Sequence, residues 1–298
     1  MANMAIRRSN GEKIFNVFNI TIMVLLSIIT LYPFLYVLFA SFSDGAQLLQ
    51  HKGALLWFKG FSTAAYDRVF STETVIIGFK NTLFYLIVGV GGNMFFTILG
   101  AYALSRKGIM LSRTITLLLT FTMYFSGGMI PTYMVYHELG LIGSKWAIIA
   151  SGLISTYNLI ILISSFREMP DALEESARID GAGDWTILFR IVVPLSLPSI
   201  MVIALYYAVW RWNSWFPASL YLTDVRDWPI QMFLRRMLIE EQMEEMMASS
   251  GAGTMEANSI SQTLKYAMIM VSTVPILAVY PFIQRYFVKG IMIGAVKG

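Results

Sequence analysis

Residues 14–43 read IFNVFNITIMVLLSIITLYPFLYVLFASFS, a run without a single charged side chain. A helix that crosses a hydrocarbon core of about 30 Å needs roughly 20 mostly apolar residues, so this run is long enough to span a membrane. A helix is the expected form, because it satisfies its own backbone groups where water is absent. The run follows a basic stretch, as a signal peptide does, but it is too long and lacks a small-residue cleavage site. We therefore expect an uncleaved first helix.

Five further stretches have the same character, and the whole composition agrees with them. The chain of 298 residues is 56% hydrophobic and only 13% charged, with a mean hydropathy of +0.63, whereas soluble domains carry about 25% charged residues. The alternation that barrel strands would show is missing. We predict an all-α membrane protein with one transmembrane domain over residues 1–298. Its six spans are expected at about residues 15–42, 81–105, 114–136, 146–166, 195–222 and 264–287.

Lysine and arginine residues indicate the orientation of these spans. If the N-terminus is cytoplasmic, the short inner segments carry more of them per residue than the longer outer loops. We therefore expect a multi-pass protein of the plasma membrane with both termini in the cytoplasm and outer loops at about residues 44–80 and 222–263. The second outer loop contains an acidic amphipathic stretch and then the flexible residues 249–253. It is either a solvated connector or a contact for a partner.

Several kinds of chemistry have no counterpart in the sequence. There is no cysteine, and the two histidines, His51 and His137, are far apart, so no metal site is predicted. The phosphate-binding pattern G-x-x-x-x-G-K-[ST] and the patterns H-E-x-x-H and G-x-S-x-G are absent. No basic cluster with interleaved aromatic residues predicts a nucleic-acid partner. We expect no catalytic residue and no cofactor in this chain, so any nucleotide must be bound by another subunit.

The longest inner segment carries a distinctive pattern. Residues 170–198 read PDALEESARIDGAGDWTILFRIVVPLSLP. Pro170 and Asp171 favour a helix start, and Gly181 stops that helix. Asp184 is suited to cap a second helix, and Pro194 and Pro198 are expected to end it. We therefore predict a helix–glycine turn–helix hairpin over residues 170–192 on the cytoplasmic face.

The first helix of this hairpin is small and charged, which suits docking into a groove of a soluble partner. The alternative is a simple solvated loop. The candidate docking residues are Glu174, Glu175, Ser176, Ala177, Asp180 and Gly181.

Polar residues within the spans are candidates for a substrate pathway, because they are unfavourable in lipid and face a cavity or another helix. Arg211 is the strongest candidate, since a guanidinium at the centre of a span costs roughly 2.5–3.5 kcal/mol or more on insertion scales. We favour a cavity for it, against a structural role or pairing with a phosphate near the interface. The candidate pathway residues are Tyr207, Trp210, Arg211, Asn213 and Asn158.

The inner segment resembles the coupling motif of ABC-importer permeases, E-A-A-x-x-x-G-x9-I-x-L-P. Residues 175–177 match the triplet, and Gly181, Ile191 and Pro194 match the remaining positions. Two departures are conservative, Ser176 in place of alanine and Val193 in place of leucine. Residues 29–44, 125–133, 212–217 and 280–298 also resemble carbohydrate permeases, including a subgroup for complex or acidic oligosaccharides of the alginate or pectin type.

This resemblance implies a type I ABC importer permease fold in which the hairpin contains the coupling helix. It implies a heterodimer with a second related permease, like the second membrane subunit of the maltose importer. It also implies two ATP-binding subunits, which hold ATP and Mg, and an extracytoplasmic solute-binding protein that delivers the carbohydrate. The substrate is an oligo- or polysaccharide, with acidic ones such as alginate among the candidates, and the membrane is the inner membrane of a bacterium.

Two other classes remain as alternatives. A stand-alone secondary transporter or channel would need coupling carboxylates or broken-helix repeats within the spans, and the uncharged runs contain no carboxylates. A membrane-embedded enzyme would need a nucleophile or metal cluster, which the sequence lacks. We therefore expect a transport protein that is not itself an enzyme.

Overall fold

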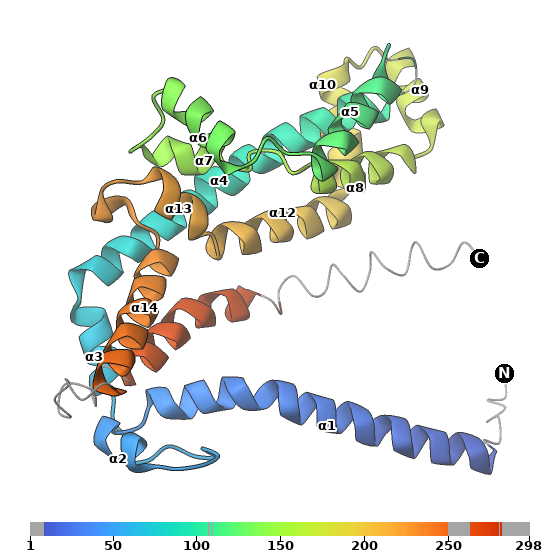
Figure 1. Cartoon of the computed structure of the whole chain (residues 1–298). Coiled ribbons are helices and arrows are strands. Elements are labelled where there is room, and N and C mark those ends of the chain that lie inside the picture. The colour runs from blue at the N-terminus through green and yellow to red at the C-terminus, as the bar shows by residue number, and fades with distance from the viewer. Residues whose placement is uncertain (1–8, 107, 109, 250–262, 280, 282–298) are drawn as a thin grey trace. The chain divides into compact units, whose positions relative to one another are not determined.

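The protein is helical throughout its described part (Figure 1). The computed structural model describes residues 9–106, 108, 110–249, 263–279 and 281, and within these ranges there is no strand, only an isolated bridge between Ser43 and Phe61. The all-α prediction is confirmed. The chain forms two compact units, residues 1–71 with 240–271, and residues 72–239 with 272–298. The expectation of one permease domain stays a prediction.

The first unit begins with the long helix α1, Asn10–Ser41. Its start is fixed by a capping box, in which the Ser9 amide donates to the Glu12 carboxylate at 2.8 Å. Its hydroxyl side chains donate back to carbonyls of the same helix, as Thr21 does to Val17 O at 2.8 Å. Apolar side chains cover most of its exposed surface. These features suit a helix whose solvent is lipid.

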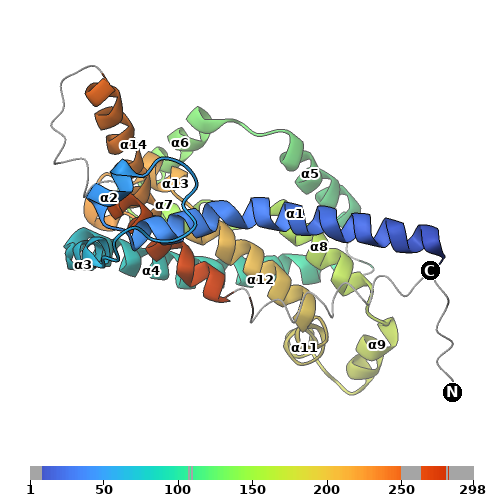
Figure 2. The ribbon, with the colours of Figure 1, turned by 90° about the horizontal axis from the view of Figure 1, so that it is seen from below.

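The second unit is built on helix α4, Glu73–Ser105, which lies along α8, Thr156–Arg167, and α12, Leu197–Trp212 (Figures 1 and 2). Buried leucine, isoleucine and aromatic side chains fill the space between these helices, with Phe166 and Ile203 among the most deeply buried.

The remaining labelled elements are α2 Gly45–Gln50, α3 Ala64–Ser71, α5 Ser112–Tyr124, α6 Met129–Glu138, α7 Lys145–Ala150, α9 Asp171–Ile179, α10 Asp184–Ile187, a π-helical turn Leu188–Val192, α11 Val193–Leu195, α13 Phe216–Tyr221, a 3-10 turn Val225–Asp227 and α14 Ile230–Ser249. A further apolar helix covers Thr263–Val279.

The expected spans need correction where they were taken as uninterrupted helices. Among the described residues, α1 and α4 are long and apolar enough to cross a membrane by themselves. The stretch 114–136 is a bent pair, α5 and α6, with a bend of 115°, and a second bend of 83° precedes α12 at Ser196. The stretch 146–166 is divided into α7 and α8, and 195–222 into α12 and α13. The six-span count therefore remains a prediction, and the last span is described only to residue 279.

Glycine explains two of these breaks. Gly128 has φ +83° between α5 and α6, and Gly152 has φ +64° between α7 and α8. This left-handed region is readily available only to glycine, so the helix cannot continue through either residue at low cost.

The break between α7 and α8 leaves backbone carbonyls without helical partners, and two neighbouring helices supply them. Asn93 of α4 is fully buried and donates to the carbonyls of Gly152 at 2.6 Å and Leu153 at 2.7 Å. Arg211 of α12 donates to the carbonyls of Ile148 and Ile149 and to Asn93 Oδ1.

The same region requires close approach of helices α4 and α12. A Cβ atom added to Gly89 would lie 2.7 Å from Arg211 Nε, closer than real contacts allow. The Tyr207 hydroxyl accepts a hydrogen bond from the Ser155 amide at 3.0 Å and shares another with Thr97 at 2.8 Å. Helices α4, α7 and α12 and the break after α7 thus form one hydrogen-bonded cluster. We call it the α7–α8 clasp (Asn93, Thr97, residues 148–155, Tyr207 and Arg211).

The first prediction concerns this clasp. Replacing Asn93 with leucine, of similar volume, should lower the free energy of unfolding by at least about 2 kcal/mol, because two buried carbonyls and one Arg211 N–H lose their partner. Thermal unfolding of the purified protein in detergent measures the change. Asn19→Leu, at an exposed position of α1, is the matched control. Equal melting temperatures for Asn93→Leu and the wild type would contradict the role of the clasp.

Candidate functional site

The hairpin has the helices that the sequence predicts. Helix α9 covers Asp171–Ile179, and α10 begins at Asp184. Gly181 has φ +83°, and the amide of Ala182 donates to the carbonyl of Ala177 at 2.9 Å, which closes the turn. The use of this hairpin in coupling stays a prediction.

One detail of the hairpin differs from the prediction. Asp184 does not cap α10: the N-cap is Gly183, and the Asp184 carboxylate instead accepts a hydrogen bond from Arg178 at 2.5 Å across the turn. The second helix continues through the π-helical turn and α11 to Leu195, so it ends between Pro194 and Pro198.

Two of the six candidate docking residues face the body of the protein. Glu174 forms an ion pair with Arg106, directly after the end of α4, and both side chains are largely buried. Ala177 packs against the core between α4, α8 and α12. Arg106 also donates to the carbonyl of Phe166 at 3.2 Å, so it joins the hairpin to the ends of α4 and α8.

The contact of Arg106 with Glu174 could not be predicted from the sequence, because the two residues are far apart in the chain. Burial lowers the pKa of its guanidinium, but arginine remains charged at neutral pH. With Arg167, Asp171 and Glu175 it lines a cavity of about 600 Å³ under the hairpin.

The other four candidates, Glu175, Ser176, Asp180 and Gly181, are exposed. Beside them protrudes Ile179, whose side chain is 87% exposed. Trp185 and Phe189 of the second helix are also exposed and stack on each other with ring centroids 6.0 Å apart. Ile179 is not among the predicted docking residues, although a large apolar residue beside Asp180 on a charged helix is a usable signal. We call this exposed surface the hairpin tip (Glu175, Ser176, residues 178–181, Trp185 and Phe189).

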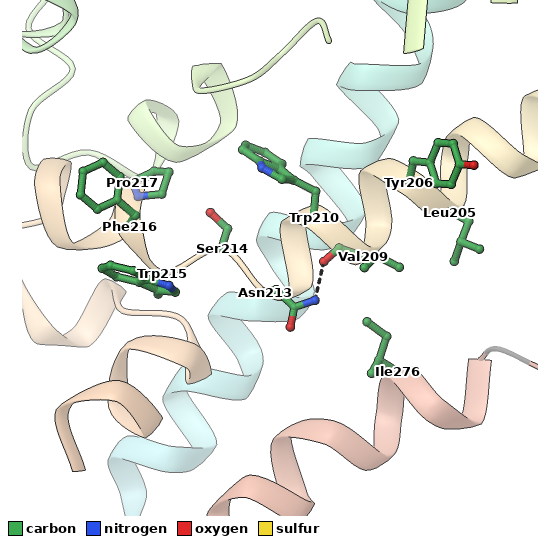
Figure 3. A pocket seen from close by; sticks show the side chains of 10 residues that line it. All are labelled: Leu205, Tyr206, Val209, Trp210, Asn213, Ser214, Trp215, Phe216, Pro217 and Ile276. Carbon is green, nitrogen blue, oxygen red and sulfur yellow. Dashed lines mark hydrogen bonds between the residues drawn. The ribbon is translucent and has the colours of Figure 1, made fainter. Parts of the chain in front are cut away.

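A pocket of about 710 Å³ lies at the C-terminal end of α12 (Figure 3). Trp210 and Asn213 line it, together with aromatic residues that follow in the chain and Ile276 of the last described helix. The Asn213 amide donates to the carbonyl of Val209 at 2.9 Å, the contact dashed in Figure 3. The last helix is attached here, because Trp212 Nε1 donates to the carbonyl of Ser272 at 2.9 Å.

A second cavity of about 470 Å³ contains the other predicted pathway residues. Tyr207 and Asn158 line it, and Trp210 lines it as well as the first pocket. Both Tyr207 and Asn158 are buried, and the Tyr207 hydroxyl is engaged in the clasp. Trp210 is thus the candidate with the largest accessible surface among these three.

Arg211 requires a correction. Its side chain is only 3% exposed and lines neither cavity, since its donors are taken up by Asn93 and the carbonyls of α7. These contacts support the structural alternative for Arg211 rather than the cavity. One residue further along a helix turns a side chain by about 100°, so Arg211 faces α4 while Trp210 faces the pockets.

The described part of the second outer loop is attached firmly to α4. Asn81 donates to the carbonyls of Arg226 at 2.7 Å and Trp228 at 3.1 Å, and Tyr85 donates to that of Asp227 at 2.8 Å. Hydrogen bonds from Arg226 hold the pKa of the Asp224 carboxyl below its usual value. Residues 250–253 of the flexible segment lie outside the described residues, so the two interpretations of that segment stay open.

Comparison with known proteins gives consistent similarities. No protein-family model matches. The chain is 42% identical over 288 residues to the polygalacturonan/rhamnogalacturonan transport system permease protein of Bacillus subtilis, covering 96% of this chain and 99% of that protein.

Solved structures agree with this similarity. The crystal structure of a bacterial ABC transporter involved in the import of the acidic polysaccharide alginate superimposes with a TM-score of 0.87 and 31% identity, over 95% of this chain and 100% of that one. A second structure, of a bacterial alginate ABC transporter in complex with an alginate pentasaccharide-bound periplasmic protein, gives a TM-score of 0.53 with 17% identity, over 93% and 96% of the two chains. At that identity it shows the fold alone.

The second prediction concerns the anchor of the hairpin. Arg106→Gln removes the ion pair with Glu174, and a buried charged hydrogen bond contributes roughly 1.5–3 kcal/mol. Amide hydrogen exchange of residues 171–182 should therefore become at least about tenfold faster. Arg190→Gln, an exposed arginine on the second helix, is the control and should leave that exchange unchanged. Unchanged exchange in Arg106→Gln would show that the core contacts alone hold α9.

Proposed function

The chain belongs to the family of ABC sugar-transport permeases, and from this we propose that it forms one half of a heterodimeric, ATP-driven import pathway for an oligo- or polysaccharide. The observation that carries the proposal is the 42% identity to a permease over almost the whole length of both chains. Its apolar helices and its relatives make it a multi-pass protein of a bacterial inner membrane. In this proposal it has six spans, and both termini are cytoplasmic.

The partners in this proposal are a second related permease, two ATP-binding subunits and an extracytoplasmic solute-binding protein. The ATP-binding subunits hold ATP and Mg, so the chemistry of hydrolysis belongs to them. The relative named as a permease protein of a transport system supports assembly with further subunits. The relatives named for pectin-type polymers and alginate support an acidic saccharide as the substrate.

The hairpin tip is the proposed contact with the ATP-binding subunits. An exposed isoleucine surrounded by carboxylates and a hydroxyl presents an apolar centre with a polar rim, which is the usual composition of a protein interface. Because Arg106 fixes α9 to the end of α4, a displacement of the tip would be passed directly to the spans. ATP binding would thereby favour one of the two orientations of the pathway through its different affinity for each.

The test of the proposal is reconstitution. Proteoliposomes that contain this chain, the second permease and the ATP-binding subunits should take up a labelled oligogalacturonide when ATP and the binding protein are present. Omission of the ATP-binding subunits should abolish uptake. Uptake by this chain alone would instead support a stand-alone transporter or channel.

The third prediction concerns Ile179. Ile179→Glu should reduce both ATP-driven uptake and recovery of the ATP-binding subunits with the permease, because burial of such a side chain contributes roughly 1.5–3 kcal/mol, which is about 10- to 100-fold in affinity. Uptake assays and co-purification measure the two effects. Ile179→Leu keeps the apolar volume and should retain activity. Wild-type uptake by Ile179→Glu, at equal amounts in the membrane, would remove the tip from the interface.

A further inference from the structure

The pocket at the end of α12 has an arginine beside it that no part of the transport mechanism above uses. Arg235 is an exposed residue of α14, and its Cζ atom lies 3.3 Å above the centroid of the Trp215 ring. Trp215 is one of the residues that line the pocket of about 710 Å³ (Figure 3). Stacking of a guanidinium on an aromatic face leaves its N–H groups directed outward and fixes a side chain that is otherwise flexible.

The cation of Arg235 has no acidic partner within the described ranges. Arg106, Lys145, Arg178 and Arg226 form ion pairs, and Arg235 is not among them. The residues that line the pocket include no aspartate or glutamate. The pocket therefore has an apolar lining, and one of its residues, Trp215, is in contact with a positive charge that no residue of the lining neutralises.

The lining itself suits a sugar ring. Tyr206, Trp210 and Phe216 are each more than a third exposed, so their aromatic faces are accessible. Aromatic side chains supply a broad, rigid contact surface, and the C–H face of a pyranose is the apolar part of a sugar. Asn213 uses its amide N–H on Val209 and so keeps its Oδ1 as an acceptor, and Ser214 adds a hydroxyl. Mostly apolar walls with a few polar groups are typical of small-molecule sites.

We propose that this pocket binds a uronate-containing saccharide, with the sugar ring on the aromatic lining and its carboxylate on Arg235. The proposal deepens the proposed function and rests on it. A carboxylate and a guanidinium form short charge-assisted hydrogen bonds, often in pairs, and a neutral sugar gains none of these. Arg211, the arginine that the sequence favoured for this role, is buried in the clasp and is excluded from the pocket.

The experiment compares two saccharides of the same length, trigalacturonate, which is charged, and its fully methyl-esterified form, which is neutral. Binding of each to the assembled importer in nanodiscs, without nucleotide and without the binding protein, is measured by equilibrium dialysis, so that the binding protein's own preference does not enter. The variants are Arg235→Gln, Arg235→Lys and Trp215→Leu, and Arg236→Gln is the control at the neighbouring exposed position.

The expected result is a charge-specific loss. Arg235→Gln should weaken binding of trigalacturonate about tenfold, which corresponds to about 1.4 kcal/mol, and leave the methyl ester unchanged. Arg235→Lys should give a smaller loss because it keeps the charge without the planar stack. Trp215→Leu should weaken both saccharides, and Arg236→Gln should change neither. Raising the salt concentration should reduce the difference between wild type and Arg235→Gln.

Several outcomes would overturn the inference. Equal losses for both saccharides in Arg235→Gln would show that the arginine only supports Trp215. Equal affinities of the wild type for trigalacturonate and its ester would show that the pocket does not recognise charge. Either result leaves the proposed function intact, provided that the reconstituted importer takes up an oligogalacturonide with ATP. Absence of that uptake would contradict the proposed function independently.

Discussion

The second unit depends on how the carbonyl groups at the end of α7 are satisfied. A broken helix inside an apolar segment exposes acceptors that lipid cannot hydrogen-bond. Here an asparagine on α4 and an arginine on α12 supply the donors, so the break is stable only while these three elements stay together. The charge of Arg211 is accommodated in the same way, because several carbonyl dipoles surround it in place of a counter-ion. The same contacts thus satisfy the carbonyls at the break and compensate for the burial of the Arg211 charge.

Helix α4 connects the functional regions along its length. Near its beginning, Asn81 and Tyr85 hold the loop that follows α13. Its centre contributes Asn93 to the clasp, and directly after its end Arg106 holds the hairpin. The regions assigned to substrate and to ATP-binding subunits are therefore attached to one continuous helix. A continuous helix is a rigid element of the kind through which a displacement at one attachment could reach the others.

The sequence predicted the class of the fold and the hairpin well, because both depend on local signals. An uncharged run specifies a lipid-exposed helix, and Gly181 specifies the turn after α9. The breaks at Gly128 and Gly152 were harder to locate, since hydropathy measures composition and is insensitive to the sign of φ. The orientation of Arg211 depended on carbonyls about 60 residues away in the chain. Arg235 and Trp215 are likewise separated in sequence, so only the folded chain brings them together.

The glycine at position 89 has a mechanical consequence. Arg211 rests against the bare backbone of α4 at that point, so neither helix can slide or rotate past the other without a collision. Interdigitated contacts of this kind favour movement of α4, α7 and α12 as a single rigid body. Helices α5 and α6 are different, because no buried residue lies within either of them. The bent α5–α6 segment is therefore the part of this unit that is packed least tightly, and its bend of 115° lies at Gly128.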